Sequence, residues 1–218
     1  PEKKIQEVPF PRLTYKEAME KYKSDKPDLR KDKSDKNLLA FCWVIDFPFF
    51  EKDDEDGWTF THNPFSAPQT EYMADLMEKK NIGNIITTQY DMALNGVEVG
   101  GGGIRNHTPG ALEKVFEIMG YEKAEIRENF GHMMQAFSFG APPHGGIAYG
   151  FDRLLTTLLD EISIREVIAF PKTGDGRDLM MDAPSEIYDK QLKELHINIK
   201  KSKKQNPLGP QDIPKAES

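Results

Sequence analysis

Apolar and polar residues are distributed unevenly along the chain. Residues 1–36 are polar and rich in Lys and Asp, and their last six residues predict a linker, because such a charged run has no hydrophobic face to bury. Leu38 to Phe50 is almost continuously apolar and predicts a buried strand that ends at Pro48. After about Ile199 the chain is polar again, which is typical of a flexible tail.

Further strands are predicted from shorter runs. Trp58 to Thr61 is a short β-like run, and Ile164 to Phe170 is another that ends before a proline. Ile85 to Leu94 and Val97 to Val99 are joined by Asn95-Gly96, which is the strongest short sequence signal for a hairpin.

Helices are predicted over residues 14–22, 108–120, 122–137 and 151–159. The first has Thr14 as N-cap and Glu17 at the capping-box position, and the second begins with Thr108 and a first-turn proline. The last is mostly apolar and is expected to be buried. The order of elements predicts an α+β fold with a mainly antiparallel sheet, because the regular βαβ alternation of a Rossmann fold is missing.

Composition narrows the class of protein. The 218 residues are enough for one sizeable domain or a small domain with appendages. No apolar run approaches the roughly 18 residues of a membrane helix, and the first residues lack the pattern of a signal peptide. The single cysteine, Cys42, excludes an internal disulfide and a cysteine-based zinc site. We therefore expect a cytoplasmic protein with no membrane partner and with a reduced, buried Cys42.

The net charge of −7 argues against a chain that binds nucleic acid over its whole surface. Its one basic cluster is more typical of a solvated tail and consists of Lys200, Lys201, Lys203 and Lys204. RNA binding through this cluster is kept as a weaker alternative hypothesis.

The first candidate for chemistry is the segment from Glu98 to Arg105, which encloses four consecutive glycines. Glycines allow positive φ and close approach of the backbone to a ligand, so a strand running into them should aim Glu98 and Arg105 at the same small volume. The carboxylate suits a hydrated Mg²⁺, a sugar hydroxyl or an amine. The guanidinium suits a carboxylate or a phosphate. Taken alone, a glycine-rich hairpin with a surface ion pair is an equally good interpretation.

The second candidate runs from Gly140 to Leu155, where a glycine-rich strand enters a helix with Arg153 in its first turn. Helix N-termini favour anions and the arginine adds a fixed positive fork, which together suit a nucleotide triphosphate. The segment lacks the Gly-Lys-Ser/Thr of a Walker loop. His144 and Asp152, each taken alone, are more typical of structural roles.

The third candidate is His62, which precedes a rigid loop with two prolines and is a possible lid residue. Taken alone, this segment is more typical of an ordinary polar loop. The histidines of the chain show no HExxH-type spacing, so a zinc site is not expected.

Together these segments resemble the bacterial aspartyl-tRNA synthetase family. Residues 146–154 look like motif 3 of class II synthetases, and the resemblance covers roughly residues 8–197. It is also seen in the segments 10–15, 24–30, 43–48, 91–102 and 168–173.

The resemblance implies a class II synthetase fold, with an antiparallel sheet flanked by helices. Residues 38–199 would form the catalytic core, and residues 1–37 an N-terminal segment whose charged linker replaces the large insertion domain of bacterial members. Residues 200–218 would form a flexible basic and polar tail.

The resemblance also implies an enzyme, a ligase that uses ATP and Mg²⁺. Glu98 would contact ATP and its Mg²⁺, and Arg153 would bind the γ-phosphate. The rest of the nucleotide site would be lined by Gly150, Phe151 and Asp152. Catalysis in the family relies on positioning and electrostatic stabilisation, with no covalent enzyme intermediate.

The amino-acid substrate implied by the resemblance is L-aspartate, which is activated to aspartyl-adenylate and transferred to tRNA. Arg105 would pair with the side-chain carboxylate of aspartate, and His62 would lie on the mobile loop that closes over it. The tRNA partner implied is tRNA(Asp), and the resemblance leaves open whether tRNA(Asn) is a second one. A second copy of the chain, in a homodimer, is also implied.

The chain departs from the family pattern at several points. Asn63 stands where family members usually carry a second histidine. Motif 1, motif 2 and the anticodon-binding domain are expected upstream of the residues given, so we expect little or no aminoacylation by this chain alone.

Two alternative functions stay open at this point. The first is a related enzyme built on the same scaffold, such as an asparaginyl-tRNA synthetase or an asparagine synthetase. A catalytically silent paralogue that acts as a binding module is the other, although Glu98, Arg105 and Arg153 are all present.

Overall fold

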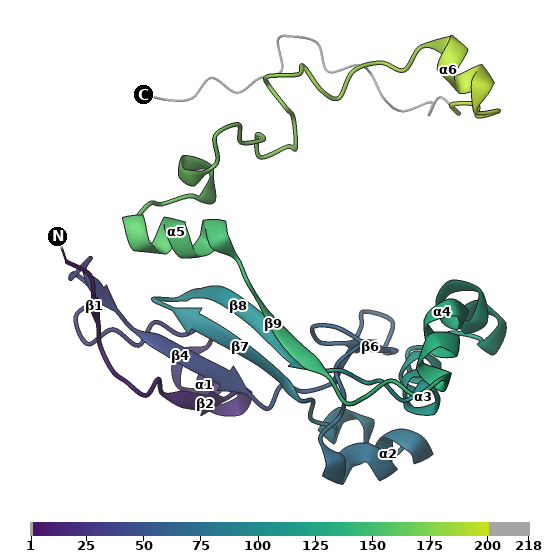
Figure 1. Cartoon of the computed structure of the whole chain (residues 1–218), viewed down its shortest axis with the longest axis horizontal. Helices are drawn as coiled ribbons and strands as arrows, with labels where there is room; N and C mark the ends of the chain where they lie inside the picture. The colour runs from purple at the N-terminus through teal and green to yellow at the C-terminus, as the bar shows by residue number, and fades with distance from the viewer. Residues whose placement is uncertain (1, 201–218) are drawn as a thin grey trace. The chain divides into compact units, whose positions relative to one another are not determined.

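The computed structural model describes residues 2–200 (Figure 1). Backbone contacts divide the chain into a first unit of residues 1–169 and a second unit of residues 170–218. The N-terminal residues up to residue 37, expected to form a separate segment, are grouped with the first unit. Of the expected tail, residues 201–218 lie outside the described part of the chain, and so do Lys201, Lys203 and Lys204.

The first unit is built on a five-stranded sheet with the strand order β2-β4-β7-β8-β9. β2 pairs with β4 in parallel, and the other three pairings are antiparallel, which confirms the predicted α+β class with a mainly antiparallel sheet. The strands are β2 (Arg12–Thr14), β4 (Phe41–Ile45), β7 (Gln89–Leu94), β8 (Val97–Ile104) and β9 (Gly145–Tyr149).

Two small sheets accompany the main one: β1 (Lys4–Ile5) with β3 (Leu38–Leu39), and β5 (Phe50–Lys52) with β6 (Trp58–Phe60). The single strand predicted over Leu38–Phe50 is therefore wrong. The apolar run is divided among β3, β4 and β5, and Asp46 interrupts it with a φ of 59°. Apolar content alone predicted the burial of this run but not its turns.

The helices of the first unit are α1 (Tyr15–Tyr22), α2 (Met73–Glu78), α3 (Pro109–Ile118), α4 (Lys123–Ser138) and α5 (Phe151–Leu159). Three short 3₁₀ helices accompany them, η1 (Thr70–Tyr72), η2 (Ile82–Asn84) and η3 (Ile164–Val167). The capping box of Thr14 and Glu17 is present, as predicted. The strand predicted over Ile164–Phe170 is wrong, because its first four residues form η3, capped by the Ser163 side chain.

The described part of the second unit contains α6 (Asp189–Glu194) and a bridge between Asp178 and Ala183. No helix within residues 2–200 combines the length and the apolar character that a bilayer crossing requires.

The expectation that α5 is buried is also wrong. Leu154 and Leu158 pack against the sheet cluster around Leu94 and Val99, but no residue of α5 is buried. Phe151 is 72% exposed, because only one face of the helix contacts the sheet. Cys42, in contrast, is fully buried in β4 as predicted, and burial raises the pKa of its thiol to about 11.

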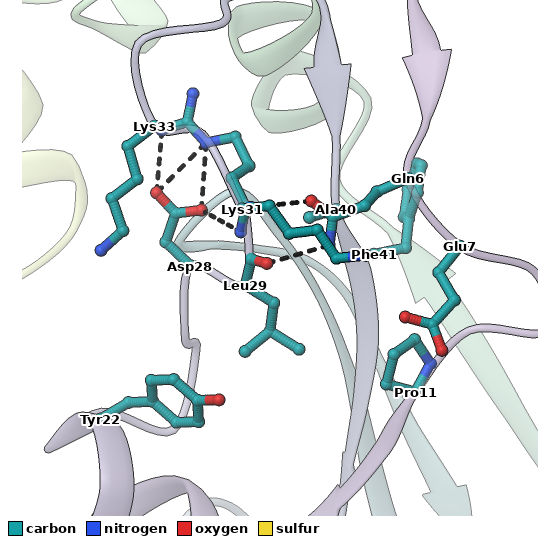
Figure 2. A pocket seen from close by; sticks show the side chains of 11 residues that line it. Gln6, Glu7, Pro11, Tyr22, Asp28, Leu29, Lys31, Lys33, Ala40 and Phe41 are labelled. Carbon is teal, nitrogen blue, oxygen red and sulfur yellow. Dashed lines mark hydrogen bonds and ion pairs between the residues drawn. The ribbon is translucent and has the colours of Figure 1, made fainter.

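The charged segment predicted as a linker is instead attached to the fold. Lys36 forms an ion pair with Asp160 (Nζ to Oδ2, 2.7 Å). Gln6 holds the preceding residues, since its side chain donates to the carbonyl of Leu29 (3.0 Å) and accepts from the backbone N–H of Lys31 (2.8 Å). Gln6, Leu29 and Lys31 help to line a pocket of about 430 Å³ (Figure 2), which contains none of the residues predicted for catalysis.

A cluster of charges around Glu117 ties α3 to its neighbours. The carboxylate of Glu117 contacts Lys114, Lys79 and Lys123, and the first two hold its pKa at about 2. We expect Glu117→Gln to lower the free energy of unfolding by about 1 kcal/mol at pH 7, because the amide loses its ion pairs with lysines that are partly exposed to solvent. Chemical denaturation measures this effect, and Glu128→Gln is the control, because Glu128 is exposed on α4 and forms no ion pair among residues 2–200.

The pH dependence gives this prediction its sign. A folded-state pKa below the ordinary value of 4.5 means that the contribution of Glu117 is present at neutral pH and is lost as the pH falls from 4.5 toward 2. The difference between Glu117→Gln and the unaltered protein should therefore shrink below pH 4. A difference that stays constant from pH 7 to pH 2 would contradict it.

Candidate active site

The β7–β8 hairpin forms the base of the candidate site. Asn95 and Gly96 make its turn with φ values of 52° and 89°, so the hairpin predicted from this dipeptide is confirmed. The four glycines that follow do not adopt the positive φ expected from the sequence. They continue β8 as an extended strand.

Close neighbours explain two of these glycines. A Cβ atom on Gly100 would lie 2.7 Å from the ring of Tyr149, and one on Gly102 would lie 2.1 Å from the carbonyl oxygen of Gly146. Larger residues would therefore separate β8 from β9, the strand that leads directly into α5 (Figure 1).

The other face of β8 carries acidic groups beside bare backbone. A Cβ atom on Gly101 would lie 3.0 Å from Asp91 Oδ1 and 3.3 Å from Glu98 Oε1. Glu98 shares this face because a bulge shifts the β7–β8 register by one residue. The glycine backbone is thus open to a ligand on the face that bears two carboxylates.

Arg153 reaches Glu98 from the first turn of α5. Its Nη1 lies 3.3 Å from Glu98 Oε2 and donates to the carbonyl oxygen of Glu98 at 3.2 Å. Gly150 fixes the start of the helix, since its N–H donates to the carbonyl of Val99 at 2.9 Å. The side chains of Arg153 and Glu98 are 52% and 40% exposed, so both stay accessible to a ligand. Phe151 and Asp152 lie beside Arg153 in the same turn.

Asp91 is a buried carboxylate on the same face, only 6% exposed. Burial, and then the charge of Glu98, raise its pKa from 3.8 to about 6, although His62 and a hydrogen bond from Gln89 oppose this. Two carboxylates in one partly dry region favour a cationic ligand between them.

His62 lies near this acidic region. Its Nε2 is 3.6 Å from Oδ2 of Asp25, and its ring meets the edge of Phe47 with the ring centres 4.7 Å apart. The loop around residue 62 lies beside β7, because Asn63 Nδ2 donates to Gln89 Oε1 at 3.2 Å, and the contact of His62 with Asp25 brings the loop around residue 25 to the same place.

Arg105 lies at the far end of β8. Its N–H donates to the carbonyl of His144 at 2.8 Å, and its side chain helps to line a pocket of about 260 Å³ with Phe65, Asn106, Met133, Phe137 and His144. Strand alternation from Gly103 puts it on the same face as Glu98, but about 20 Å away along the strand. The expectation that Glu98 and Arg105 meet in one small volume is therefore wrong, because the glycines extend the chain between them.

A comparison with protein families decides what kind of protein this is. The family model of tRNA synthetases class II (D, K and N) matches residues 2–174. The chain belongs to this family. The matched residues contain all the site residues described above, from Asp25 to Arg153.

Curated relatives of this class II synthetase chain are aspartate–tRNA ligases. The aspartate–tRNA(Asp/Asn) ligase of Chlorobium chlorochromatii is 50% identical over 176 residues, which cover 80% of the chain and 29% of the relative. The aspartate–tRNA ligase of Streptomyces coelicolor is 49% identical over 168 residues, covering 77% of the chain and 28% of the relative. The chain thus spans less than a third of the length of these relatives.

Solved structures of synthetases share the fold. The aspartyl-tRNA synthetase of Entamoeba histolytica superposes with a TM-score of 0.54 at 22% identity, over 78% of this chain and 33% of that one. The asparaginyl-tRNA synthetase of the same organism, in complex with asparaginyl-adenylate, gives 0.55 at 21% identity, over 80% and 38%. At this identity the likeness supports the class II fold and does not separate aspartate from asparagine.

Two residues of the synthetase site were missed from the sequence. Asp91 is the one charged residue in an apolar run, and a buried carboxylate in a strand is a signal that could have singled it out. Asp25 gave no signal by itself, because only the tertiary fold brings its loop beside His62.

Asp91 is expected to destabilise the folded synthetase at neutral pH. Its folded-state pKa lies above the unfolded value, so the free energy of unfolding should fall as the pH rises from 3.8 to about 6. Asp91→Asn should remove this fall and be more stable than the unaltered protein by about 2 kcal/mol at pH 8. Urea denaturation at pH 4, 6 and 8 tests it, and equal stabilities at pH 8 would contradict the prediction.

Proposed function

We propose that the protein is an aspartate–tRNA ligase and that this chain carries the part of it that binds ATP and L-aspartate for activation. The observation that carries the proposal is the distribution of charge on one face of β8. Arg153 and Glu98 stand at one end, Arg105 at the other, and bare glycine backbone lies between them. ATP and aspartate bound side by side, with the γ-phosphate at Arg153 and the side-chain carboxylate of aspartate at Arg105, have the charges and the length that suit such a track.

The proposed reaction has two steps. A carboxylate oxygen of aspartate attacks the α-phosphorus of ATP, the bond to the β-phosphate oxygen breaks, and pyrophosphate leaves. The terminal ribose hydroxyl of the tRNA then attacks the aspartyl carbonyl, and AMP leaves. Arg153 neutralises phosphate charge, and Arg105 holds the side-chain carboxylate so that only the α-carboxylate reacts.

The carboxylates of Glu98 and Asp91 suit the two positively charged groups that the substrates bring, the α-ammonium group of aspartate and the Mg²⁺ carried by ATP. Glu98 and Asp91 face each other across Gly101, and a magnesium ion carried by ATP needs only one or two protein carboxylates. No group of three or more His, Cys, Asp or Glu within residues 2–200 is arranged to hold a metal by itself. When bound, Mg²⁺ would reduce the phosphate charge that opposes attack.

Further parts of the proposal concern partners and location. Acylation of tRNA(Asp), and of tRNA(Asn) in addition, is supported by the names of the Chlorobium relatives. A homodimer and a cytoplasmic location are proposed from the family resemblance.

Aspartate-dependent exchange of pyrophosphate into ATP tests the proposal. Because we expect little or no activity from these 218 residues alone, the protein is purified at its full natural length and assayed with Mg²⁺ and with aspartate, asparagine or no amino acid. We expect exchange with aspartate only. Equal exchange with asparagine would favour the asparaginyl-type alternative, and no exchange, together with no melting shift by ATP and Mg²⁺, would favour a silent binding module.

A further inference from the structure

The loop that carries His62 is held together by one side chain, that of Asn63. Its Oδ1 accepts hydrogen bonds from the backbone N–H of Phe65 and of Ser66, both at 3.0 Å. It also accepts one from the hydroxyl of Ser66 at 3.2 Å. Three donors on one oxygen fold residues 63–66 into a tight turn directly after His62.

These donors also fix which way the Asn63 amide points. A backbone N–H can only donate, so the atom facing Phe65 and Ser66 must be the oxygen. The NH₂ group of Asn63 therefore faces Gln89 and donates to its Oε1 at 3.2 Å.

The same donor-to-acceptor direction continues from Gln89 to Asp91. Because Gln89 accepts through Oε1, it presents its own NH₂ group to Asp91, with Nε2 3.4 Å from each carboxylate oxygen. Gln89 and Asp91 are 7% and 6% exposed, so water competes little for these groups. The network runs in one direction, from the loop backbone through Asn63 and Gln89 to the carboxylate of Asp91.

We propose that Asn63 is a positioning residue that holds the His62 loop against β7 and orients Gln89 toward Asp91 before aspartate binds. Asn63 acts through these residues and does not touch the substrate. The proposal rests on the proposed function where it concerns aspartate, but the holding of the loop can be tested without activity.

Two variants separate the two roles of Asn63. Asn63→Ala removes the acceptor and the donor. Asn63→Asp keeps an acceptor for the N–H groups of Phe65 and Ser66 but turns a second acceptor toward Gln89, which opposes the observed direction. The matched control is Asn84→Ala, because Asn84 is exposed and makes no side-chain hydrogen bond within the described part of the chain.

Hydrogen exchange of the loop amides is the first measurement. In Asn63→Ala we expect the amides of Phe65 and Ser66 to exchange about tenfold faster or more, as the loss of a hydrogen bond predicts. Asn63→Asp and Asn84→Ala should leave them close to the unaltered protein. Loop amides that are unprotected in the unaltered protein, or unchanged in Asn63→Ala, would overturn the proposal.

The second measurement is aspartate-dependent pyrophosphate exchange, made on the same proteins. The KM for aspartate should rise about tenfold in Asn63→Ala and also in Asn63→Asp, while the KM for ATP stays unchanged. A purely structural role would change both constants or neither, and an unchanged KM for aspartate in Asn63→Asp would refute the link to Gln89. If the unaltered protein shows no exchange, the proposed function fails and the loop measurement alone decides whether Asn63 holds the loop.

Discussion

Replacing Arg153 by alanine is expected to lower kcat/KM for ATP in pyrophosphate exchange by about 10²–10³-fold. The guanidinium is the cation that meets Glu98 on the face of β8, at 3.3 Å, and it sits at the start of a helix where anions are favoured. Without it, no positively charged side chain would stand between the triphosphate and the carboxylates of Glu98 and Asp91. Losses of this size are typical when one charged contact to a reacting group is removed.

The control for Arg153 is Arg165→Ala. Arg165 is exposed in η3 and forms no ion pair among residues 2–200, so its removal changes net charge equally without touching the proposed site. We expect the control to keep its kcat/KM for ATP within about twofold. A similar loss in both variants, or no loss in Arg153→Ala, would contradict the role given to Arg153.

Replacing Arg105 by leucine is expected to lower kcat/KM for aspartate by about 10³-fold or more, with little effect on the KM for ATP. The loss is large because, without the guanidinium, the side-chain carboxylate of bound aspartate would be left in the site with no charged partner. Arg105→Lys keeps the charge but not the bidentate fork, so we expect an intermediate loss.

The relative use of asparagine gives the sharper test of Arg105. Removal of the guanidinium should reduce exchange with aspartate far more than any residual exchange with asparagine. The ratio of aspartate-dependent to asparagine-dependent exchange should therefore fall. Arg127→Leu, on the exposed side of α4, is the control and should leave the ratio unchanged. An unchanged ratio in Arg105→Leu would show that the aspartate carboxylate is recognised elsewhere.

Local signals in the sequence predicted those parts of the fold that depend on neighbours along the chain. The capping box at Thr14, the Asn95-Gly96 hairpin and the proline-led start of α3 each involve residues a few positions apart, and all three are present. Arg153 was placed in the first turn of α5 by the same kind of reasoning.

Features that depend on distant residues were not predicted. The glycines of β8 follow from the positions of Tyr149 and Gly146, which lie more than 40 residues away in sequence, so neither the extended strand nor the separation of Glu98 from Arg105 was foreseen. The approach of Asp25 and Asp91 to His62 likewise depends on tertiary packing. The exposed face of α5 reflects which surface meets the sheet, and hydrophobicity alone does not determine that.

A structure of the purified protein with a non-hydrolysable aspartyl-adenylate analogue tests the central claim most directly. The account predicts that the analogue lies along the glycine track of β8, with its side-chain carboxylate about 3 Å from the guanidinium of Arg105 and its adenosine end toward Arg153. An analogue bound away from this face, or one whose side-chain carboxylate leaves Arg105 unpaired, would contradict it.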